Sequence, residues 1–134
     1  MPLEAMEHFN IRATDLEATK EFYCNVLGMT VGERPAFNFP GYWIYLGNTA
    51  CVHLILADPS DAQKVEGSGA IDHVAFAGTH IRAFVANAKA CNVAMTHNKV
   101  PDFGIHQIFV HDPDGIKVEL NFRGEDAQNY DPET

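Results

Sequence analysis

The chain has 134 residues, a formal net charge of −9, and 46% hydrophobic and 20% charged residues. This length fits one domain, and the acidic balance argues against nucleic acid and anionic membranes as partners. No run of 18 apolar residues occurs, and the N-terminal sequence MPLEAMEHF lacks the basic and apolar regions of a signal peptide. We therefore expect a cytoplasmic protein. The three cysteines are widely spaced and odd in number, which argues against a disulfide framework.

The first half of the chain predicts a strand, a helix and three further strands. Residues 5–12 alternate between apolar and polar side chains, as a strand does. Thr14 begins a capping-box pattern that ends at Glu17, and an apolar stripe of helical spacing then continues to Gly28. Turn residues separate the three strands that we expect next, near 30–37, 42–47 and 50–56.

The second half repeats this order after a polar segment, 58–69, which we expect to be a linker. A strand is predicted over 70–77 and a helix over 80–91, and three strands follow near 93–98, 105–111 and 115–122. The sequence therefore predicts an α+β fold with two βαβββ modules, 5–57 and 70–122, in one domain, 5–122. We expect their sheets to curve around a shared metal-binding cavity. The polar tail, 123–134, is expected to fray.

Four side chains of metal-ligand type stand at matching places in the two halves. His8 and His73 open the halves, each six residues before a threonine, and His53 and Glu119 lie 45 and 46 residues further on. Side chains on a strand alternate between faces, and all four fall in the phase opposite the apolar, helix-packing residues. The repeat therefore predicts that these four side chains gather at one place.

Imidazole and carboxylate groups together suit one divalent ion per site, namely Zn, Ni, Fe, Mn or Co. Such a centre stabilises an oxyanion that develops during a reaction, provided that a coordination position stays open. Three further histidines, His80, His97 and His111, lack this support, and we expect them at the surface near turns.

Three motifs carry a resemblance to a known family. They are H-x-x-x-R-x-x-D-L with F-Y-x-x-x-L-G between His8 and Gly28, D-H-V-A-F from Asp72, and F-V-x-D-P-D-G-x-x-x-E-L from Phe109. In these motifs the chain resembles the vicinal oxygen chelate superfamily, which includes glyoxalase I, methylmalonyl-CoA epimerase, fosfomycin-resistance proteins, extradiol dioxygenases and bleomycin-binding proteins. The resemblance covers residues 5–122. It implies paired βαβββ modules around a metal, a small-molecule substrate and a homodimer, with four metal ligands: His8, His53, His73 and Glu119.

The resemblance also suggests residues that contact the substrate. Arg12 matches an arginine that binds a substrate carboxylate in glyoxalase I. We expect His106 and Gln107 beside the cavity, although neighbouring strand residues face opposite ways and one of the two should enter it. Trp43 and Tyr45 precede His53 and are candidates for the wall of an apolar pocket.

The leading functional hypothesis is a metal-dependent lyase or isomerase of glyoxalase type that stabilises an enediolate, with Glu119 or His53 as the base. One alternative is a ring-cleaving dioxygenase that holds Fe(II) through His8, His73 and Glu119 and uses His53 for proton transfer. Dioxygenases of this type carry a tyrosine where this chain has Phe109, which counts against that activity. The other alternative is a non-catalytic module that binds an antibiotic or aromatic ligand.

Overall fold

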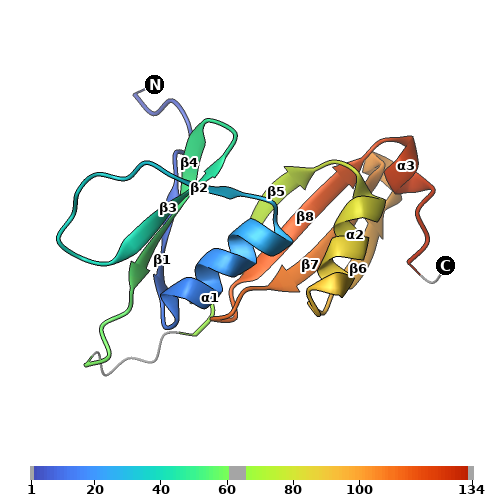
Figure 1. Ribbon diagram of the computed structural model, residues 1–134. Helices are drawn as coiled ribbons and strands as arrows, with labels where there is room; N and C mark the ends of the chain where they lie inside the picture. Colours follow the sequence, from blue (N-terminus) through green and yellow to red (C-terminus); the bar gives the residue numbers. More distant parts are fainter. Residues whose placement is uncertain (1, 61–65, 133–134) are drawn as a thin grey trace. The chain divides into compact units, whose positions relative to one another are not determined.

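A computed structural model describes residues 2–60 and 66–132. Its helices and strands, in chain order, are β1 (Phe9–Ala13), α1 (Leu16–Glu21), the π-helical turn η1 (Phe22–Val26), β2 (Thr30–Gly32), β3 (Gly41–Leu46), β4 (Thr49–Leu56), β5 (Val74–Gly78), α2 (Ile81–Ala90), β6 (Thr96–Val100), the 3₁₀ turn η2 (Pro101–Phe103), β7 (Ile105–His111), β8 (Lys117–Arg123) and α3 (Glu125–Gln128) (Figure 1).

The chain forms two compact units, residues 1–65 and 66–134, and each contains one βαβββ module. Each unit has a four-stranded mixed sheet, with strand orders β1-β4-β3-β2 and β5-β8-β7-β6. In both sheets the first strand pairs in parallel with the last strand of its module, and the remaining pairs are antiparallel. The predicted α+β class and the internal repeat are therefore confirmed. The metal-binding cavity around which the sheets were expected to curve stays a prediction.

In the first unit, α1 and η1 cover the face of the sheet that carries the alternate apolar residues. Tyr42 on β3 donates a hydrogen bond to Glu17 of α1, and Lys20 lies over the Tyr42 ring. Ile44 pairs with Val52 in register on the same face, and both are fully buried. This alternation turns the intervening residues of β3 and β4 to the opposite face, which carries His53.

The second unit repeats this arrangement with α2. Phe84 of α2 packs against Phe122 of β8, with ring centroids 5.7 Å apart. Val118 and Leu120 are buried on the same face of β8, so that Glu119 between them points to the other face. The turn between β7 and β8 needs Gly115, which has a φ of +84°, and the Asp112 carboxylate accepts hydrogen bonds from the backbone on both sides of this turn.

Two local predictions differ from the structure at helix ends. The first helix is capped by Asp15, whose carboxylate accepts a hydrogen bond from the Ala18 backbone at 3.0 Å, and not by Thr14. The second helix begins after His80, which has a φ of 60° and provides no side-chain cap. Asp and Thr are both good capping residues, so the choice between adjacent candidates depended on the backbone path from β1.

The predicted polar tail contains ordered structure. A short helix, α3, forms within it, and Ala127 and Tyr130 are buried, whereas we expected residues 123–134 to fray. The burial of Ala127 and Tyr130 anchors this segment to the rest of its unit. The expected linker, 58–69, lies partly outside the described residues, which omit 61–65. Within the described part of the chain, no helix is long and apolar enough to cross a membrane.

Candidate functional site

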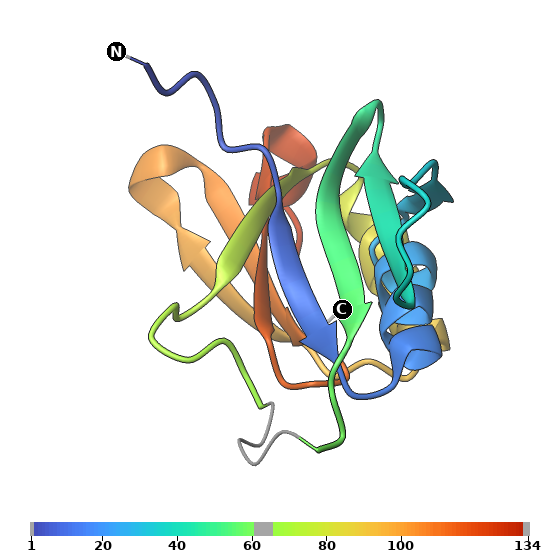
Figure 2. The ribbon, with the colours of Figure 1, turned by 90° about the vertical axis from the view of Figure 1, so that its left-hand side faces the viewer.

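Three rings are stacked on the exposed face of the first sheet. The imidazole of His53 on β4 lies between the His8 imidazole, at a centroid distance of 3.7 Å, and the Trp43 indole, at 4.1 Å. The planes of both neighbours lie within 14° of the His53 ring. This contact follows from strand pairing, because Trp43 on β3 is the register partner of His53 and His8 immediately precedes β1 on its other side (Figure 2). The stack leaves His53 only 7% exposed and fixes the plane of its ring.

The second unit brings together the other two predicted ligands. His73 immediately precedes β5, as His8 precedes β1, and its Nε2 lies 3.4 Å from Oε1 of Glu119 on β8. Parallel pairing of β5 with β8 places Ala75 opposite Glu119, which brings the start of β5 next to this carboxylate. Glu119 is largely buried, with 12% of its side chain exposed, whereas His73 is more open at 37%.

Each of the two opening histidines is held by the acidic residue that precedes it. Nδ1 of His8 lies 2.9 Å from the Glu7 carboxylate, and Nδ1 of His73 lies 2.8 Å from the Asp72 carboxylate. A carboxylate that accepts the Nδ1 proton leaves Nε2 unprotonated in the neutral ring, so that Nε2 can donate its lone pair to a metal. The negative charge of Asp72 is itself stabilised, because the hydrogen bond from His73 and the nearby Lys117 lower the pKa of this carboxyl group.

A chain of hydrogen-bonded side-chain amides orients the Glu119 carboxylate. It lies on the open face of the second sheet, the face opposite buried Val118 and Leu120. Asn121 donates a hydrogen bond to Oε2 of Glu119 at 2.8 Å and accepts one from Gln107 at 3.2 Å. Gln107 in turn accepts a hydrogen bond from Asn98 at 2.8 Å. These residues come from β8, β7 and β6 and form one row across the sheet. Oε1 of Glu119 is the oxygen that points toward His73.

The structure separates the two predicted substrate contacts on β7. Gln107 shares the open face with Glu119, whereas His106 is buried on the opposite face with 1% exposure. His106 instead bonds His97, with 2.8 Å between its Nε2 and Nδ1 of His97, and His97 is therefore not the surface residue we expected. Arg12 on β1 is exposed and lies on the His53 face of the first sheet, because Asn10, two residues before it, is the register partner of His53.

The donor atoms of the second unit fit a divalent ion. Two atoms that bind one ion at roughly 2.1 Å, with angles between about 90° and 109°, lie about 3.0–3.4 Å apart. The His73 Nε2 to Glu119 Oε1 distance of 3.4 Å is within this range. Among the described residues, neither unit alone gathers three His, Cys, Asp or Glu side chains into a metal-holding cluster. Each unit thus contains one pair of ligand-type side chains.

Burial keeps His53 neutral. Desolvation lowers the pKa of His53 below its ordinary value of 6.5, and the charge of His8 acts in the same direction. A neutral imidazole can bind a metal or accept a proton, so this environment suits both roles that the sequence left open. Two of the thiols are not poised for chemistry, because burial raises the pKa of Cys24 and of Cys51.

Residues 5–120 match a model of the Glyoxalase/Bleomycin resistance protein/Dioxygenase superfamily, and the chain belongs to this superfamily. One relative is the mitochondrial methylmalonyl-CoA epimerase of Bos taurus, 30% identical over 129 residues that cover 88% of this chain and 74% of that protein. Another is the uncharacterized protein YaeR of Escherichia coli (strain K12), 29% identical over 124 residues that cover 88% and 95%.

A solved structure with a similar fold is the genomically encoded fosfomycin resistance protein FosX of Listeria monocytogenes. It has a TM-score of 0.71 and 16% identity, over 94% of this chain and 98% of that one. The superfamily includes enzymes and bleomycin-resistance proteins, so membership defines the fold and not the activity of this chain.

Sequence reasoning missed two features of the site. The first is the acidic residue before each opening histidine, which was visible as the repeated pairs Glu7-His8 and Asp72-His73. The second is the amide row, because Asn98 lies on a different strand from Glu119 and only the strand register brings the two into one network. No local pattern carries that information.

Proposed function

We propose that the protein is a metal-dependent enzyme of glyoxalase type, a lyase or isomerase that moves a proton next to a carbonyl group of a small oxygenated substrate. The observation that carries this proposal is the pair formed by His73 and Glu119, whose facing atoms are 3.4 Å apart and whose other polar atoms are held by Asp72 and Asn121. Side chains whose orientation is fixed by a second hydrogen-bonded residue are typical of groups that hold an ion or act on a substrate.

The proposed ligands are His8, His53, His73 and Glu119, one pair from each unit. A divalent ion of the group Zn, Ni, Fe, Mn or Co would supply positive charge beside the substrate oxygen that becomes negative during proton removal. Three neutral imidazoles and one carboxylate leave part of that charge uncompensated, which suits stabilisation of an oxyanion. The pairs of one site can be contributed by one chain or by two copies, and we propose a homodimer on the example of the superfamily.

Glu119 is the proposed base. Its carboxylate has 12% exposure, and Oε2 is occupied by the Asn121 amide, so Oε1 would take the proton when it is not in contact with the ion. His53 is the other candidate, because burial keeps its ring neutral. A base that is correctly placed contributes roughly 10²–10⁴-fold to the rate of proton transfer.

Arg12 and Gln107 are the proposed substrate contacts. Arg12 is an exposed cation on the His53 face, which suits a carboxylate or another anionic group of the substrate. Gln107 lies on the Glu119 face and is connected to it through Asn121. His106 is left out of this proposal, because its side chain faces the interior of the second unit.

Solvent exchange tests the reaction class directly. The metal-loaded protein is incubated in D₂O with hemithioacetals of 2-oxoaldehydes and with 2-methyl-branched acyl thioesters, and deuterium incorporation beside the carbonyl is followed by NMR. We expect exchange that a chelator abolishes and that Glu119→Gln slows by about 10²–10⁴-fold. The matched control is Glu21→Gln, an exposed carboxylate on α1. Exchange that persists unchanged in Glu119→Gln would remove Glu119 from the mechanism.

A ring-cleaving dioxygenase is the second candidate, favoured by the neutral His53 ring beside His8 and by the His73–Glu119 pair. Phe109 counts against it, since this residue is the register partner of Glu119 and presents no hydroxyl group there. Oxygen uptake with catechols after anaerobic Fe(II) loading discriminates the two activities. Ligand binding that is insensitive to chelators and to His73→Ala, without turnover, would instead favour a non-catalytic binding module.

A further inference from the structure

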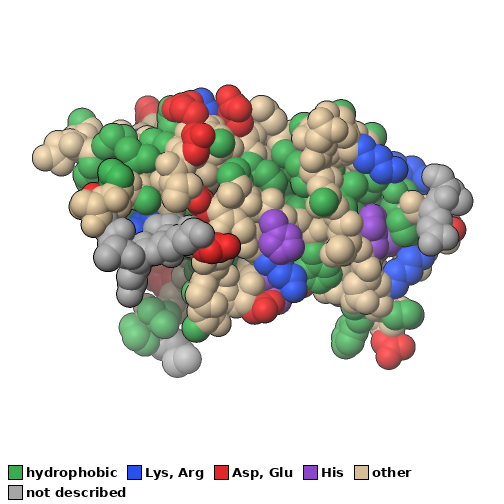
Figure 3. All heavy atoms as spheres, turned by 90° about the horizontal axis from the view of Figure 1, so that it is seen from below, with side chains coloured by type: hydrophobic (Ala, Val, Ile, Leu, Met, Phe, Trp, Pro, Cys, Tyr) green, Lys and Arg blue, Asp and Glu red, His purple; other side chains and the backbone are tan. Residues whose placement is uncertain are grey.

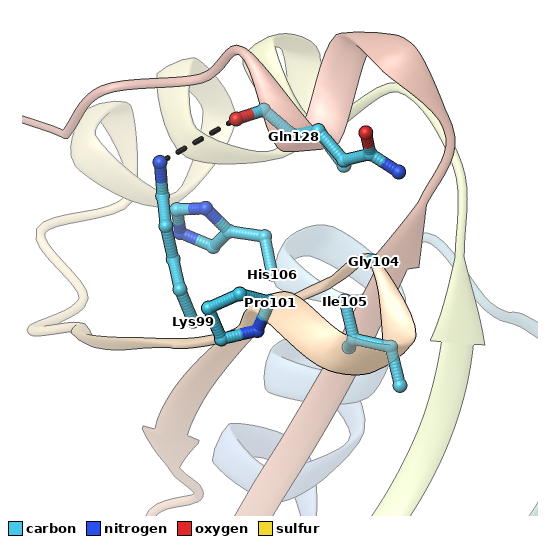
Figure 4. Close-up of a pocket in the computed structure, with 7 residues that line it drawn as sticks. Lys99, Pro101, Gly104, Ile105, His106 and Gln128 are labelled. Carbon is cyan, nitrogen blue, oxygen red and sulfur yellow. Dashed lines mark hydrogen bonds between the residues drawn. The ribbon is translucent and has the colours of Figure 1, made fainter.

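The second unit contains a cavity on the face of its sheet away from Glu119. It lies between η2, the start of β7 and α3, and seven residues line it: Lys99, Pro101, Gly104, Ile105, His106, Ala127 and Gln128 (Figure 4). Its volume is about 190 Å³. A water molecule occupies roughly 30 Å³ of liquid, so the space accommodates about six waters or one small organic molecule.

The polar side chains that line this cavity are hydrogen-bond donors. Lys99 reaches over the opening, with its Nζ 3.5 Å from the Gln128 backbone carbonyl (Figure 4). Within the residues described, no carboxylate lies within 4.0 Å of the Lys99 ammonium, and the lining contains no Asp or Glu. The Gln128 amide is a second donor and lies close to Gly104. A Cβ atom added at Gly104 would be 2.6 Å from the Gln128 amide nitrogen.

His106 supplies a buried polar group at the wall of the cavity. Its Nε2 is occupied by His97, and its Nδ1 lies against the backbone of Ala127 without a hydrogen bond of normal geometry in the part of the chain that is described. Polar atoms that are this well buried nearly always have a partner. Burial is the main cause that lowers the pKa of His106, and the charges of His97 and Lys99 lower it further. The ring therefore remains neutral.

Charges of both signs surround the cavity: Arg82 and Lys89 lie on α2, whereas Asp102 lies on η2 and Glu125 and Asp126 lie in the first turn of α3. Arg82 lies over the Tyr130 ring at 5.2 Å, Tyr130 packs on His106 with ring centroids 5.4 Å apart, and the charge of Lys89 acts on His97. Figure 3 shows one face of the molecule, on which His side chains lie next to Lys and Arg side chains, with Asp and Glu side chains nearby. Among the lining residues themselves, the one formally charged side chain is the cation Lys99, which can attract an anion.

We propose that this cavity binds a short-chain organic monocarboxylate, with Lys99 neutralising the carboxylate and Gln128 providing a hydrogen bond. One ammonium group matches one negative charge, and Pro101, Ile105 and Ala127 offer apolar surface to a short hydrocarbon chain. The site is separate from the candidate catalytic residues, since His106 and Glu119 face opposite sides of the same sheet. It does not depend on the proposed function.

Titration of the full-length, ¹⁵N-labelled protein with sodium butyrate, followed by ¹H–¹⁵N NMR, tests this site. We expect saturable shifts confined to the amides around His106 and Ala127. Loss of a charge-assisted hydrogen bond should weaken butyrate binding about tenfold in Lys99→Gln. Lys89→Gln removes the same charge from an exposed position outside the lining, and we expect a change below about twofold there. Gln128→Ala should weaken binding by an intermediate factor.

Three outcomes would overturn the proposal. They are the absence of saturable shifts with butyrate, equal binding by the Lys99 and Lys89 variants, and tighter binding of inorganic phosphate than of butyrate. Because all three substitutions are at exposed positions, unchanged dispersion of the spectrum verifies that each variant is folded.

Discussion

The imidazole of His53 and the indole of Trp43 lie face to face, with their centroids 4.1 Å apart and their planes inclined by 11°. Trp43 is the only tryptophan of the chain, so its fluorescence reports on the state of the neighbouring imidazole. A protonated ring places a cation on the indole face, where it interacts strongly with the π-electrons. This contact gives direct access to the protonation state of a candidate catalytic residue.

We expect the emission of Trp43 to be constant above about pH 6.5 and to fall on acidification, because burial and the charge of His8 lower the pKa of His53 from its ordinary value. The midpoint should therefore lie below 6.5. Fluorescence titration checks this, with His53→Gln as the variant that loses the transition and His80→Gln as the exposed control. A transition that is the same in His53→Gln would have to arise from another group.

Stability should decrease on acidification because burial, full or partial, disfavours the charged form of three histidines. Burial lowers the pKa of His53, His97 and His106, so below about pH 6.5 the unfolded chain binds more protons than the folded one. Their contribution is thus fully present above that pH and is lost as the pH falls through the lowered values. Each group contributes up to about 1.4 kcal/mol per pH unit within its window.

Urea unfolding at several pH values between 5 and 8 measures this dependence. We expect His106→Gln to flatten the decline of the unfolding free energy, whereas His111→Gln, an exposed change on the same strand, should leave its slope unaltered. The comparison uses slopes, so a general loss of stability in the His106 variant does not obscure it. Parallel slopes in wild type and His106→Gln would contradict the prediction.

The carboxylates that hold the two opening histidines should influence metal affinity. Asp72→Asn removes the acceptor of His73 Nδ1, and Glu7→Gln does the same for His8. We expect each change to weaken binding of Zn or Ni by about 10–100-fold, the usual effect of groups that orient a metal-ligating histidine. Competition with a chromophoric chelator provides the measurement, and the exposed Asp102→Asn serves as control. Affinities equal to that of wild type would mean that the orientation of these rings is set elsewhere.

The core of the first unit should tolerate truncation poorly. Leu54 is fully buried between β1 and β3, so Leu54→Ala removes packed methyl groups and leaves a cavity. We expect a loss of about 2–5 kcal/mol in the free energy of unfolding. Leu46→Ala, at a position that is 47% exposed, should cost well under this amount. Chemical denaturation of both variants measures the free energy of unfolding. Similar losses of this free energy in the two variants would show that Leu54 is not part of a tightly packed core.

The order of strands and helices followed from local patterns, but some bounds did not. The strand expected near 30–37 forms only at Thr30–Gly32, and the strand expected near 93–98 lies at Thr96–Val100. The alternation around Val118 and Leu120 correctly predicts which face Glu119 occupies, because a two-residue period survives in any sheet with one packed face. The same rule left His106 and Gln107 undecided. Neighbours on a strand must face opposite ways, but the sequence of β7 does not state which face α2 and α3 cover.

The sequence by itself determined the duplication, the order of elements within each half and the matching places of the ligand-type side chains in both halves. These features are local or repeat in register, so they require no knowledge of distant contacts. Only the tertiary structure decided that His53 is enclosed by His8 and Trp43, that His97 and His106 pair beneath Tyr130, and that Ala127 and Tyr130 are buried. The physical reason is that strand register and packing, rather than local spacing, bring such residues into contact.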